Sequence, residues 1–209
     1  MIIQTPITHH LDFEHVYEPA EDSFLLLDAL EKDLESLKES VFCLEIGSGS
    51  GIISVALASV LPTSFVFACD LNPKACQATL KTAQVNNEQN RKIDVIHCDF
   101  LQGFPLDSHP GFDLIVCNPP YVATEEKETE HNDIFASWAG GVQGRHLTDK
   151  LIEKLPTLLS DQGCAYIVLE QCNHPNEVKD KVESLQLKAD FVLSRRAGRE
   201  FLRILKVKR

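Results

Sequence analysis

The sequence of 209 residues has no apolar run long enough to span a bilayer, and its N-terminus lacks the charged-then-apolar pattern of a signal peptide. We therefore expect no membrane partner. It also lacks a basic excess, because the formal net charge is −11. A protein that binds nucleic acid by neutralising phosphates needs a basic face. The charge thus argues against nucleic acid as a partner and is compatible with a basic peptide.

Metal-binding patterns are missing as well. The seven cysteines form no Cys-x-x-Cys pair, and the eight histidines show no metal-ligand spacing, so we predict no metal site. Most cysteines fall on predicted strands, which indicates small buried thiols in a reducing compartment. The length predicts a single domain over residues 1–209, with residues 1–40 as an N-terminal extension and helix and residues 41–209 as the core.

A glycine-rich turn organises the rest of the chain. An apolar strand over Val41–Ile46 runs into Gly47, Gly49 and Gly51, and a helical run follows. An open parallel sheet holds a nucleotide-like ligand with this arrangement, because glycine lets the backbone approach the ligand closely. The Gly-x-Gly-x-Gly spacing departs from the Gly-x-Gly-x-x-Gly of dinucleotide binders. Glu45 would repel a pyrophosphate, so the turn suits a cationic ligand better.

Strands and helices alternate through the core, which predicts a doubly wound α/β fold. The predicted strands after the first are Ser64–Asp70, Ile93–Cys98, Phe112–Cys117, Gly163–Glu170, Lys188–Ser194 and Glu200–Val207, the last two as an antiparallel hairpin. The predicted helices are Ala20–Leu37, Gly51–Leu61, Pro73–Asn86, Arg145–Leu159 and Pro175–Leu185.

Acidic residues end two of these strands. Asp70 follows Gly51 by 19 residues, the place from which a carboxylate accepts hydrogen bonds from ribose hydroxyls. Asp99 could accept a hydrogen bond from an adenine amino group, and Phe100 could make an apolar contact with the base. A solvated carboxylate at a strand end is the alternative for Asp70.

Asn118-Pro119-Pro120-Tyr121 follows the strand Phe112–Cys117 directly and is the most specific signal in the chain. The two prolines end the strand and stiffen the backbone, which holds Asn118 beside the glycine turn. The Asn118 side-chain oxygen and the Pro119 carbonyl can accept the two N–H groups of a planar NH2, and Tyr121 can stack on it. Such a clamp suits methylation of an amide or an aromatic amine.

Two acidic segments keep two interpretations each. Glu21 and Asp22 either stabilise the start of the first helix through its dipole or face the cofactor. The segment Glu125–Asp133 is either a solvated surface loop or a rim that attracts a basic peptide and repels phosphate.

Together these motifs resemble class I S-adenosylmethionine-dependent methyltransferases that act on amino groups. Tyr17-Glu18-Pro19-Ala20-Glu21-Asp22-Ser23, Trp138-Ala139-Gly140-Gly141-x-x-Gly144-Arg145 and Ser194-Arg195-Arg196-Ala197-Gly198 narrow the resemblance to the eukaryotic and archaeal HemK-like branch. That branch methylates the glutamine of the Gly-Gly-Gln loop in class 1 release factors. The likeness runs from about residue 8 to the C-terminus.

The resemblance implies a Rossmann-like, mostly parallel sheet of seven strands in the order 3-2-1-4-5-7-6. It implies S-adenosylmethionine as the cofactor and S-adenosylhomocysteine as the product. The cofactor-binding residues would be Ser23, Glu45, Gly47, Gly49, Gly51, Asp70, Asp99, Phe100 and Asn118. Asn118, Pro119 and Tyr121 would be catalytic, and Asn118, Pro119, Pro120, Tyr121 and Val122 would bind the substrate.

The resemblance also implies a small zinc-ribbon activator subunit, which would form a heterodimer by extending the sheet at Ile93–Cys98. Bacterial relatives have an extra N-terminal helical domain, and we expect none here because 40 residues precede Val41. The expected substrate is a peptide chain release factor, with lysine of histone H4 as a further acceptor. We expect the protein in the cytoplasm, or in both the cytoplasm and the nucleus.

Two other functions remain open at this stage. A DNA N6-adenine methyltransferase shares the Asn-Pro-Pro-Tyr clamp, but the acidic charge argues against it, and no target-recognition domain fits in 209 residues. A non-catalytic binding module with a methyltransferase fold is the third alternative, against which the intact clamp argues.

Overall fold

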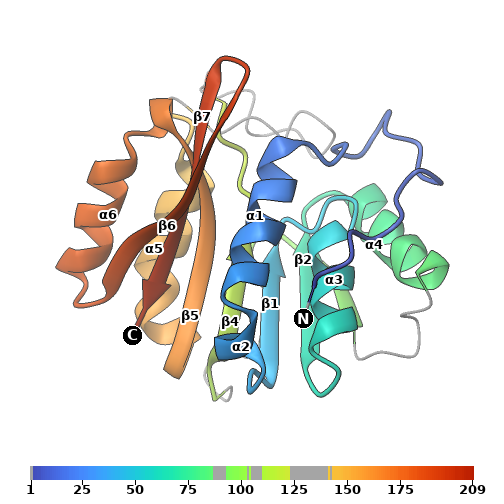
Figure 1. The fold of residues 1–209 in the computed structure, drawn as a ribbon, viewed down its shortest axis with the longest axis horizontal. Helices are drawn as coiled ribbons and strands as arrows, with labels where there is room; N and C mark the ends of the chain where they lie inside the picture. The colour runs from blue at the N-terminus through green and yellow to red at the C-terminus, as the bar shows by residue number, and fades with distance from the viewer. Residues whose placement is uncertain (1, 87–92, 103, 105–109, 123–140, 142) are drawn as a thin grey trace.

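The computed structural model describes residues 2–86, 93–102, 104, 110–122, 141 and 143–209. Figure 1 shows its strands gathered into one twisted sheet with helices packed on it. The strands are β1 (Phe42–Ile46), β2 (Phe65–Asp70), β3 (Ile93–His97), β4 (Phe112–Cys117), β5 (Leu159–Glu170), β6 (Lys188–Ala197) and β7 (Glu200–Lys208). The helices are α1 (Glu21–Lys32), α2 (Leu34–Leu37), α3 (Ile52–Val60), α4 (Pro73–Val85), α5 (His146–Leu158) and α6 (Pro175–Ser184), with a 3-10 turn η4 (Gln171–Asn173).

The strand order in the sheet is β3-β2-β1-β4-β5-β7-β6, which confirms the predicted order. The pairs from β3 through β5 are parallel. β7 pairs antiparallel with both β5 and β6, so it is the strand that runs against the others. Because β1 to β4 are parallel, their carboxyl ends meet at one edge of the sheet. That edge is where ligands bind in open α/β sheets.

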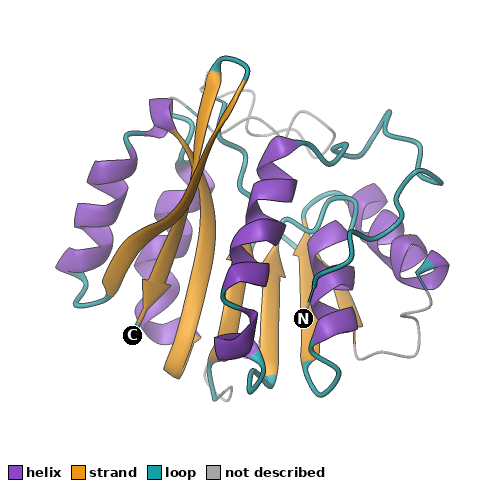
Figure 2. Ribbon diagram, in the orientation of Figure 1, coloured by secondary structure: helices purple, strands orange, loops and turns teal. Residues whose placement is uncertain are grey.

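Alternating side chains of the strands face two separate hydrophobic cores, because successive residues of a strand point to opposite faces. In β4, Val116 packs into the core with α1, α2 and α3, and Ile115 packs into the core with α5 and α6. α4 lies against α3, β2 and β3. Figure 2 shows the resulting layers, with helices drawn in purple on the strands. No helix in the described part of the chain is long and apolar enough to cross a membrane.

The predicted helix over Ala20–Leu37 is wrong in one respect, because it is interrupted at Asp33, between α1 and α2. The Asp33 carboxylate accepts hydrogen bonds from the Tyr166 hydroxyl, at 2.6 Å, and from the Lys206 ammonium. Burial alone would raise the pKa of Asp33, but the bonds from Lys206 and Tyr166 outweigh it and hold that pKa below its usual range. The break therefore ties the end of α1 to the central strands β5 and β7.

The other predicted elements are present, with ends that differ by a few residues. β5 begins at Leu159 rather than at residue 163, since Leu159 pairs with Phe112 beyond an irregularity in the β4–β5 register. β6 extends to Ala197, where the Gly198 turn leads into β7. These additions lengthen the sheet without changing its topology.

Candidate active site

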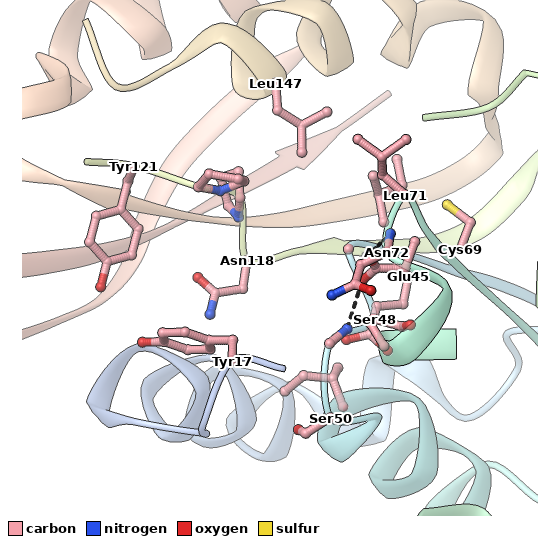
Figure 3. Close-up of a pocket in the computed structure, with 18 of the residues that line it drawn as sticks. Tyr17, Glu45, Ser48, Ser50, Cys69, Leu71, Asn72, Asn118, Tyr121 and Leu147 are labelled. Carbon is pink, nitrogen blue, oxygen red and sulfur yellow. Dashed lines mark hydrogen bonds between the residues drawn. The ribbon is translucent and has the colours of Figure 1, made fainter. Parts of the chain in front are cut away.

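A cavity of ≈ 640 Å³ lies at the carboxyl ends of the parallel strands. Figure 3 shows side chains from widely separated parts of the chain converging on it. Twelve of the thirteen predicted site residues line the cavity: Ser23, Glu45, Gly47, Gly49, Asp70, Asp99, Phe100, Asn118, Pro119, Pro120, Tyr121 and Val122. The fold thus brings together residues that the sequence places up to a hundred positions apart.

Gly51 is the predicted cofactor-binding residue that is missing from the described lining. It has φ = +80° and precedes the first residue of α3. A Cβ at this position would lie 2.7 Å from the Cα atom of Thr79 on α4. Gly51 therefore serves the close packing of α3 on α4, because only glycine adopts this backbone conformation and tolerates the approach at low cost.

The Asp70 carboxylate at the end of β2 holds the glycine turn in place. Its Oδ2 atom accepts from the backbone N–H of Gly49 at 2.9 Å, and its Oδ1 atom accepts from the N–H of Asn72 at 2.8 Å. Burial raises the pKa of Asp70, although the N–H groups of Gly49 and Asn72 oppose that rise. Asp70 is therefore a fixed acceptor at the wall of the cavity, as the strand-end prediction requires.

Glu45 lines the cavity and is buried, with 3% of the residue's surface exposed. Its Oε2 atom accepts hydrogen bonds from both the backbone N–H and the hydroxyl of Ser54. Burial raises the pKa of Glu45 to about 8, although the Ser54 bonds oppose that rise and nearby Asp70 adds to it. A cationic group bound in the cavity would favour the ionised form, since an opposite charge stabilises a carboxylate.

Asp99 and Phe100 lie beyond β3, next to α5. Phe100 has φ = +55°, which is uncommon for a residue with a side chain, and it is 9% exposed. The Lys150 ammonium of α5 lies 4.8 Å from the centre of the Phe100 ring and 3.4 Å from the Asp99 carboxylate. Lys150 therefore bridges α5 to the loop that carries both predicted base-binding residues.

At the other end of the cavity, Asn118 directly follows β4. Its side-chain oxygen is buried and has no hydrogen-bond partner within the described ranges. A buried acceptor without a partner is costly, so this atom is held ready to accept a hydrogen bond from a bound ligand. Gly47 of the glycine turn lies close by, since a Cβ on it would be 3.9 Å from the Asn118 carbonyl oxygen.

A cluster of polar residues, which we call the acceptor wall, lines the same end of the cavity. It consists of Tyr17, Asp22, Tyr121 and Glu200. The Asp22 Oδ2 atom accepts from the Tyr17 hydroxyl at 2.9 Å and from the Tyr121 hydroxyl at 3.2 Å. The Tyr121 hydroxyl also lies 3.4 Å from the Glu200 carboxylate. Figure 3 shows Tyr17 and Tyr121 at the same end of the cavity as Asn118.

The two carboxylates in the first turn of α1 have different surroundings. Asp22 is 2% exposed and lines the cavity. The exposed Glu21 carboxylate instead faces Arg195 at 3.4 Å. The Tyr121 hydroxyl bonds to carboxylates of the acceptor wall, which fixes the direction of its ring. Burial raises the pKa of Tyr121, and the nearby Asp22 carboxylate raises it further, so the hydroxyl stays protonated at neutral pH.

Several cavity residues were not predicted as site residues. Tyr17 belongs to a motif that gives it no role of its own, and Asn72 caps the start of α4, where its side chain accepts from the N–H of Lys74. Leu147 and Lys150 belong to an amphipathic helix, and Glu200 begins a strand. Nothing in their local sequence distinguishes them from ordinary helix and strand residues, so long-range packing alone reveals them.

One predicted segment and part of another lie outside the described residues. These are Glu125–Asp133 and the portion Trp138–Gly140 of the glycine motif. The motif residues that are described have structural partners. Arg145 pairs with Asp149 at 3.1 Å and with Glu177 at 3.0 Å.

Comparison with known proteins agrees with this geometry. The sequence matches the family described as methyltransferase small domain over residues 20–191. It is 41% identical to human methyltransferase HEMK2 over 206 residues, which cover 97% of this chain and 95% of the human protein. It is 37% identical to the eRF1 methyltransferase catalytic subunit mtq2 of Schizosaccharomyces pombe over 226 residues, covering 100% of this chain and 96% of that protein.

A solved structure extends the comparison to three dimensions. The Mtq2–Trm112 complex of E. cuniculi, described as responsible for the methylation of the eRF1 translation termination factor, contains a chain with a TM-score of 0.70 and 25% sequence identity. The match covers 93% of this chain and 98% of that chain. The chain described here therefore belongs to the methyltransferase small domain family, within its HEMK2-like branch.

Proposed function

We propose that this protein transfers a methyl group from S-adenosylmethionine to the side-chain amide of the glutamine in the Gly-Gly-Gln loop of a eukaryotic-type release factor. The observation that carries the proposal is the buried, unpartnered Asn118 side-chain oxygen beside the glycine turn. The S. pombe and E. cuniculi relatives are described as eRF1 methyltransferases. The high coverage of both chains supports carrying that substrate over to this protein.

The cavity residues fit the proposed cofactor. Asp70 offers a carboxylate for ribose hydroxyls, Asp99 offers an acceptor for an amino group on the base, and Phe100 offers an apolar surface. Glu45 provides negative charge for a cationic ligand, and the glycine turn leaves room at the wall where side chains would intrude. Bound there, S-adenosylmethionine would supply an electrophilic methyl group.

Residues at the end of the cavity that contains Asn118 and the acceptor wall, which we call the acceptor end, would orient the amide. The Asn118 side-chain oxygen would accept one N–H of the glutamine NH2, and the Pro119 carbonyl would accept the other. Two oriented acceptors stabilise positive charge as it develops on the nitrogen, and fixing the nitrogen in line with the methyl group lowers the barrier further. The Asp22 carboxylate, held by Tyr17 and Tyr121, would add a negative potential at the same end.

The net charge of −11 favours a protein acceptor over DNA. Adenine in DNA also carries a planar NH2 group, so the clamp alone would accept it. Lysine is a second protein acceptor to test, because Asp22 and Glu200 add two carboxylates to the cavity that Asn118 lines. The lysine ammonium must lose a proton before its nitrogen can accept a methyl group. Its tetrahedral geometry fits a planar clamp less well than an amide does.

For the partner, we propose a small zinc-ribbon activator that extends the sheet at β3. In the described sheet β3 is an edge strand that pairs with β2 alone. Its residues Ile93 and Val95 are only partly buried, and Leu80 and Val85 on the adjacent α4 are exposed. An edge strand flanked by apolar surface is suited to strand addition. Trm112 in the E. cuniculi complex is the relative's partner.

The experiment is transfer of radiolabelled methyl groups from S-adenosylmethionine by the protein co-expressed with its activator. The acceptors are a release factor with Gly-Gly-Gln, the same factor with that glutamine changed to alanine, histone H4 and duplex DNA. Label on the glutamine form and not on the alanine form is expected. Label on DNA alone would overturn the proposal.

Full activity of the protein expressed alone would overturn the activator proposal separately. We also propose that the protein acts in the cytoplasm, with or without a nuclear pool. Fractionation of cells that express a tagged chain tests that location, and a protein confined to an organelle would contradict it.

A further inference from the structure

The short turn η4 after β5 lies outside the described lining of the cavity, yet it contacts several segments that form the acceptor end. Its residue Asn173 is 1% exposed. Such a buried amide must find partners for both its oxygen and its nitrogen. Those partners identify what the turn does.

The Asn173 side chain joins two segments that lie far from it in the sequence. Its Nδ2 group donates to the Tyr121 carbonyl at 2.8 Å and to the Gly144 carbonyl at 3.0 Å. Its Oδ1 atom accepts from the backbone N–H of Glu170 at 2.9 Å. Tyr121 follows the Asn118-Pro119-Pro120 clamp directly, so this amide holds the end of the loop that carries the methyl-acceptor groups.

Gly144 makes the second contact with the same loop. Its φ is +64°, and a Cβ on it would lie 2.2 Å from the Tyr121 carbonyl oxygen and 2.6 Å from the Asn173 Nδ2 atom. The segment before α5 therefore packs against the clamp loop with no space for a side chain. This explains structurally why glycine stands at this position of the motif that ends in Arg145.

Glu170 extends the connection to the acceptor wall. Its Oε2 atom accepts from the N–H of Cys172, and its Oε1 atom accepts from the N–H of Phe201 at 3.0 Å. Phe201 directly follows Glu200, whose carboxylate lies 3.4 Å from the Tyr121 hydroxyl. The Glu170–Asn173 turn thus fixes two elements of the acceptor end relative to each other: the clamp loop and the start of β7.

We propose that Asn173 is a positioning residue that sets the clamp loop for methyl transfer, an inference that rests on the proposed function. It does not touch the acceptor or the cofactor. It acts through the Tyr121 carbonyl, which lies two residues beyond the Pro119 carbonyl that receives the acceptor N–H. A displacement of about 1 Å in such a group can lower a rate roughly 100-fold.

The cofactor end of the cavity gives the proposal a specific signature. Apart from Ser23 and Asn118, the residues that would bind the cofactor lie on β1, β2 and β3 and in the turns after them. Within the described residues, the Asn173 side chain makes its hydrogen bonds with other groups. A loss of Asn173 should therefore lower kcat and leave the affinity for S-adenosylhomocysteine unchanged. A general loss of folding would lower both.

The test is Asn173→Ala in the complex with the activator, with Gln171→Ala as the matched control in the same turn, because Gln171 is exposed. We expect kcat to fall 10- to 100-fold for Asn173→Ala. The dissociation constant for S-adenosylhomocysteine, measured by calorimetry, should stay within about threefold of wild type. Gln171→Ala should match wild type in both measurements.

A second pair of variants tests the same contact from the other side. Gly144→Ala introduces a Cβ against the Tyr121 carbonyl, whereas Gly198→Ala introduces a Cβ at φ = +59° with nothing within 4 Å. Both variants strain the backbone, but only Gly144→Ala displaces the clamp loop. We expect a loss of kcat in Gly144→Ala similar to that in Asn173→Ala, and near-normal kcat in Gly198→Ala.

A kcat within twofold of wild type in Asn173→Ala would overturn the positioning role, and so would parallel losses of kcat and S-adenosylhomocysteine affinity. The ratio of each variant's kcat to the wild-type kcat is measured with whichever acceptor the wild-type enzyme methylates. Failure of the wild type to methylate glutamine would therefore count against the proposed substrate, while the ratios still decide the role of Asn173.

Discussion

The unpartnered oxygen of Asn118 predicts that Asn118→Ala will lose turnover without losing stability. In the ligand-free protein this buried acceptor has no hydrogen-bond partner among the described residues. A buried polar atom in that state costs ~1–3 kcal/mol, and truncation removes the cost. The side chain lines the cavity rather than a packed core, so little packing is lost. We expect the free energy of unfolding to stay within about 1 kcal/mol of wild type or to rise.

The same truncation removes one of the two proposed acceptors for the substrate NH2. Loss of a single preorganised hydrogen-bonding group that stabilises a transition state costs ~2.7–4 kcal/mol, or roughly a 10²–10³-fold lower kcat. Glu45 and Asp70, which would hold the cofactor, are carried by other strands. The affinity for S-adenosylhomocysteine should therefore change by less than about threefold, well under 1 kcal/mol.

Three measurements on one preparation test this reasoning: kcat with a saturating glutamine acceptor, the dissociation constant for S-adenosylhomocysteine, and urea unfolding. Near wild-type kcat would refute the role of Asn118 as an acceptor. A fall in the unfolding free energy of about 2 kcal/mol or more would refute the structural premise, because it would mean that the oxygen has a stabilising partner in the free protein.

Three further predictions concern the cofactor end and the fold. Asp70→Asn should weaken S-adenosylhomocysteine binding at least tenfold in calorimetry, because its NH2 group must face the backbone N–H of either Gly49 or Asn72; unchanged affinity would remove Asp70 from the site. The gain in stability of Glu45→Gln over wild type should be larger at pH 8 than at pH 5. The raised pKa of about 8 means that wild-type stability falls as pH rises from 4.5 towards 8, whereas Gln does not titrate. Equal differences in melting temperature at the two pH values would contradict this. Gly51→Ala should be less stable than Gly198→Ala by ~1–3 kcal/mol in urea, since both have positive φ but only the first meets the Thr79 backbone; equal losses would show that the contact relaxes freely.

The residues that line the proposed cofactor end of the cavity could be predicted from the sequence, because their positions are determined locally. The glycine turn, Glu45, Asp70 and Asp99 each lie at the end of a predicted strand, and parallel strands bring those ends together. Periodicity also predicts the order of elements, and the family resemblance predicts the order of strands. Apart from the strand order, each of these predictions depends on residues that are near one another in the chain.

The acceptor end could be predicted only in part, because its contacts join distant segments. The clamp residue Asn118 is evident from the prolines that follow it, but the partners of Tyr121 are Asp22 and Glu200, 99 and 79 residues away. The interruption of the first helix at Asp33 has the same origin, since its partners Tyr166 and Lys206 lie on β5 and β7. Helical periodicity carries no information about such contacts.

The contrast between the two ends of the cavity has a consequence for how this enzyme could diversify. The cofactor end is encoded almost entirely between residues 45 and 100, as one inheritable block. The acceptor end is assembled from the first 22 residues, the centre of the chain and the final hairpin. Substitutions near either terminus would therefore reach the proposed acceptor end and leave the residues between 45 and 100 unchanged.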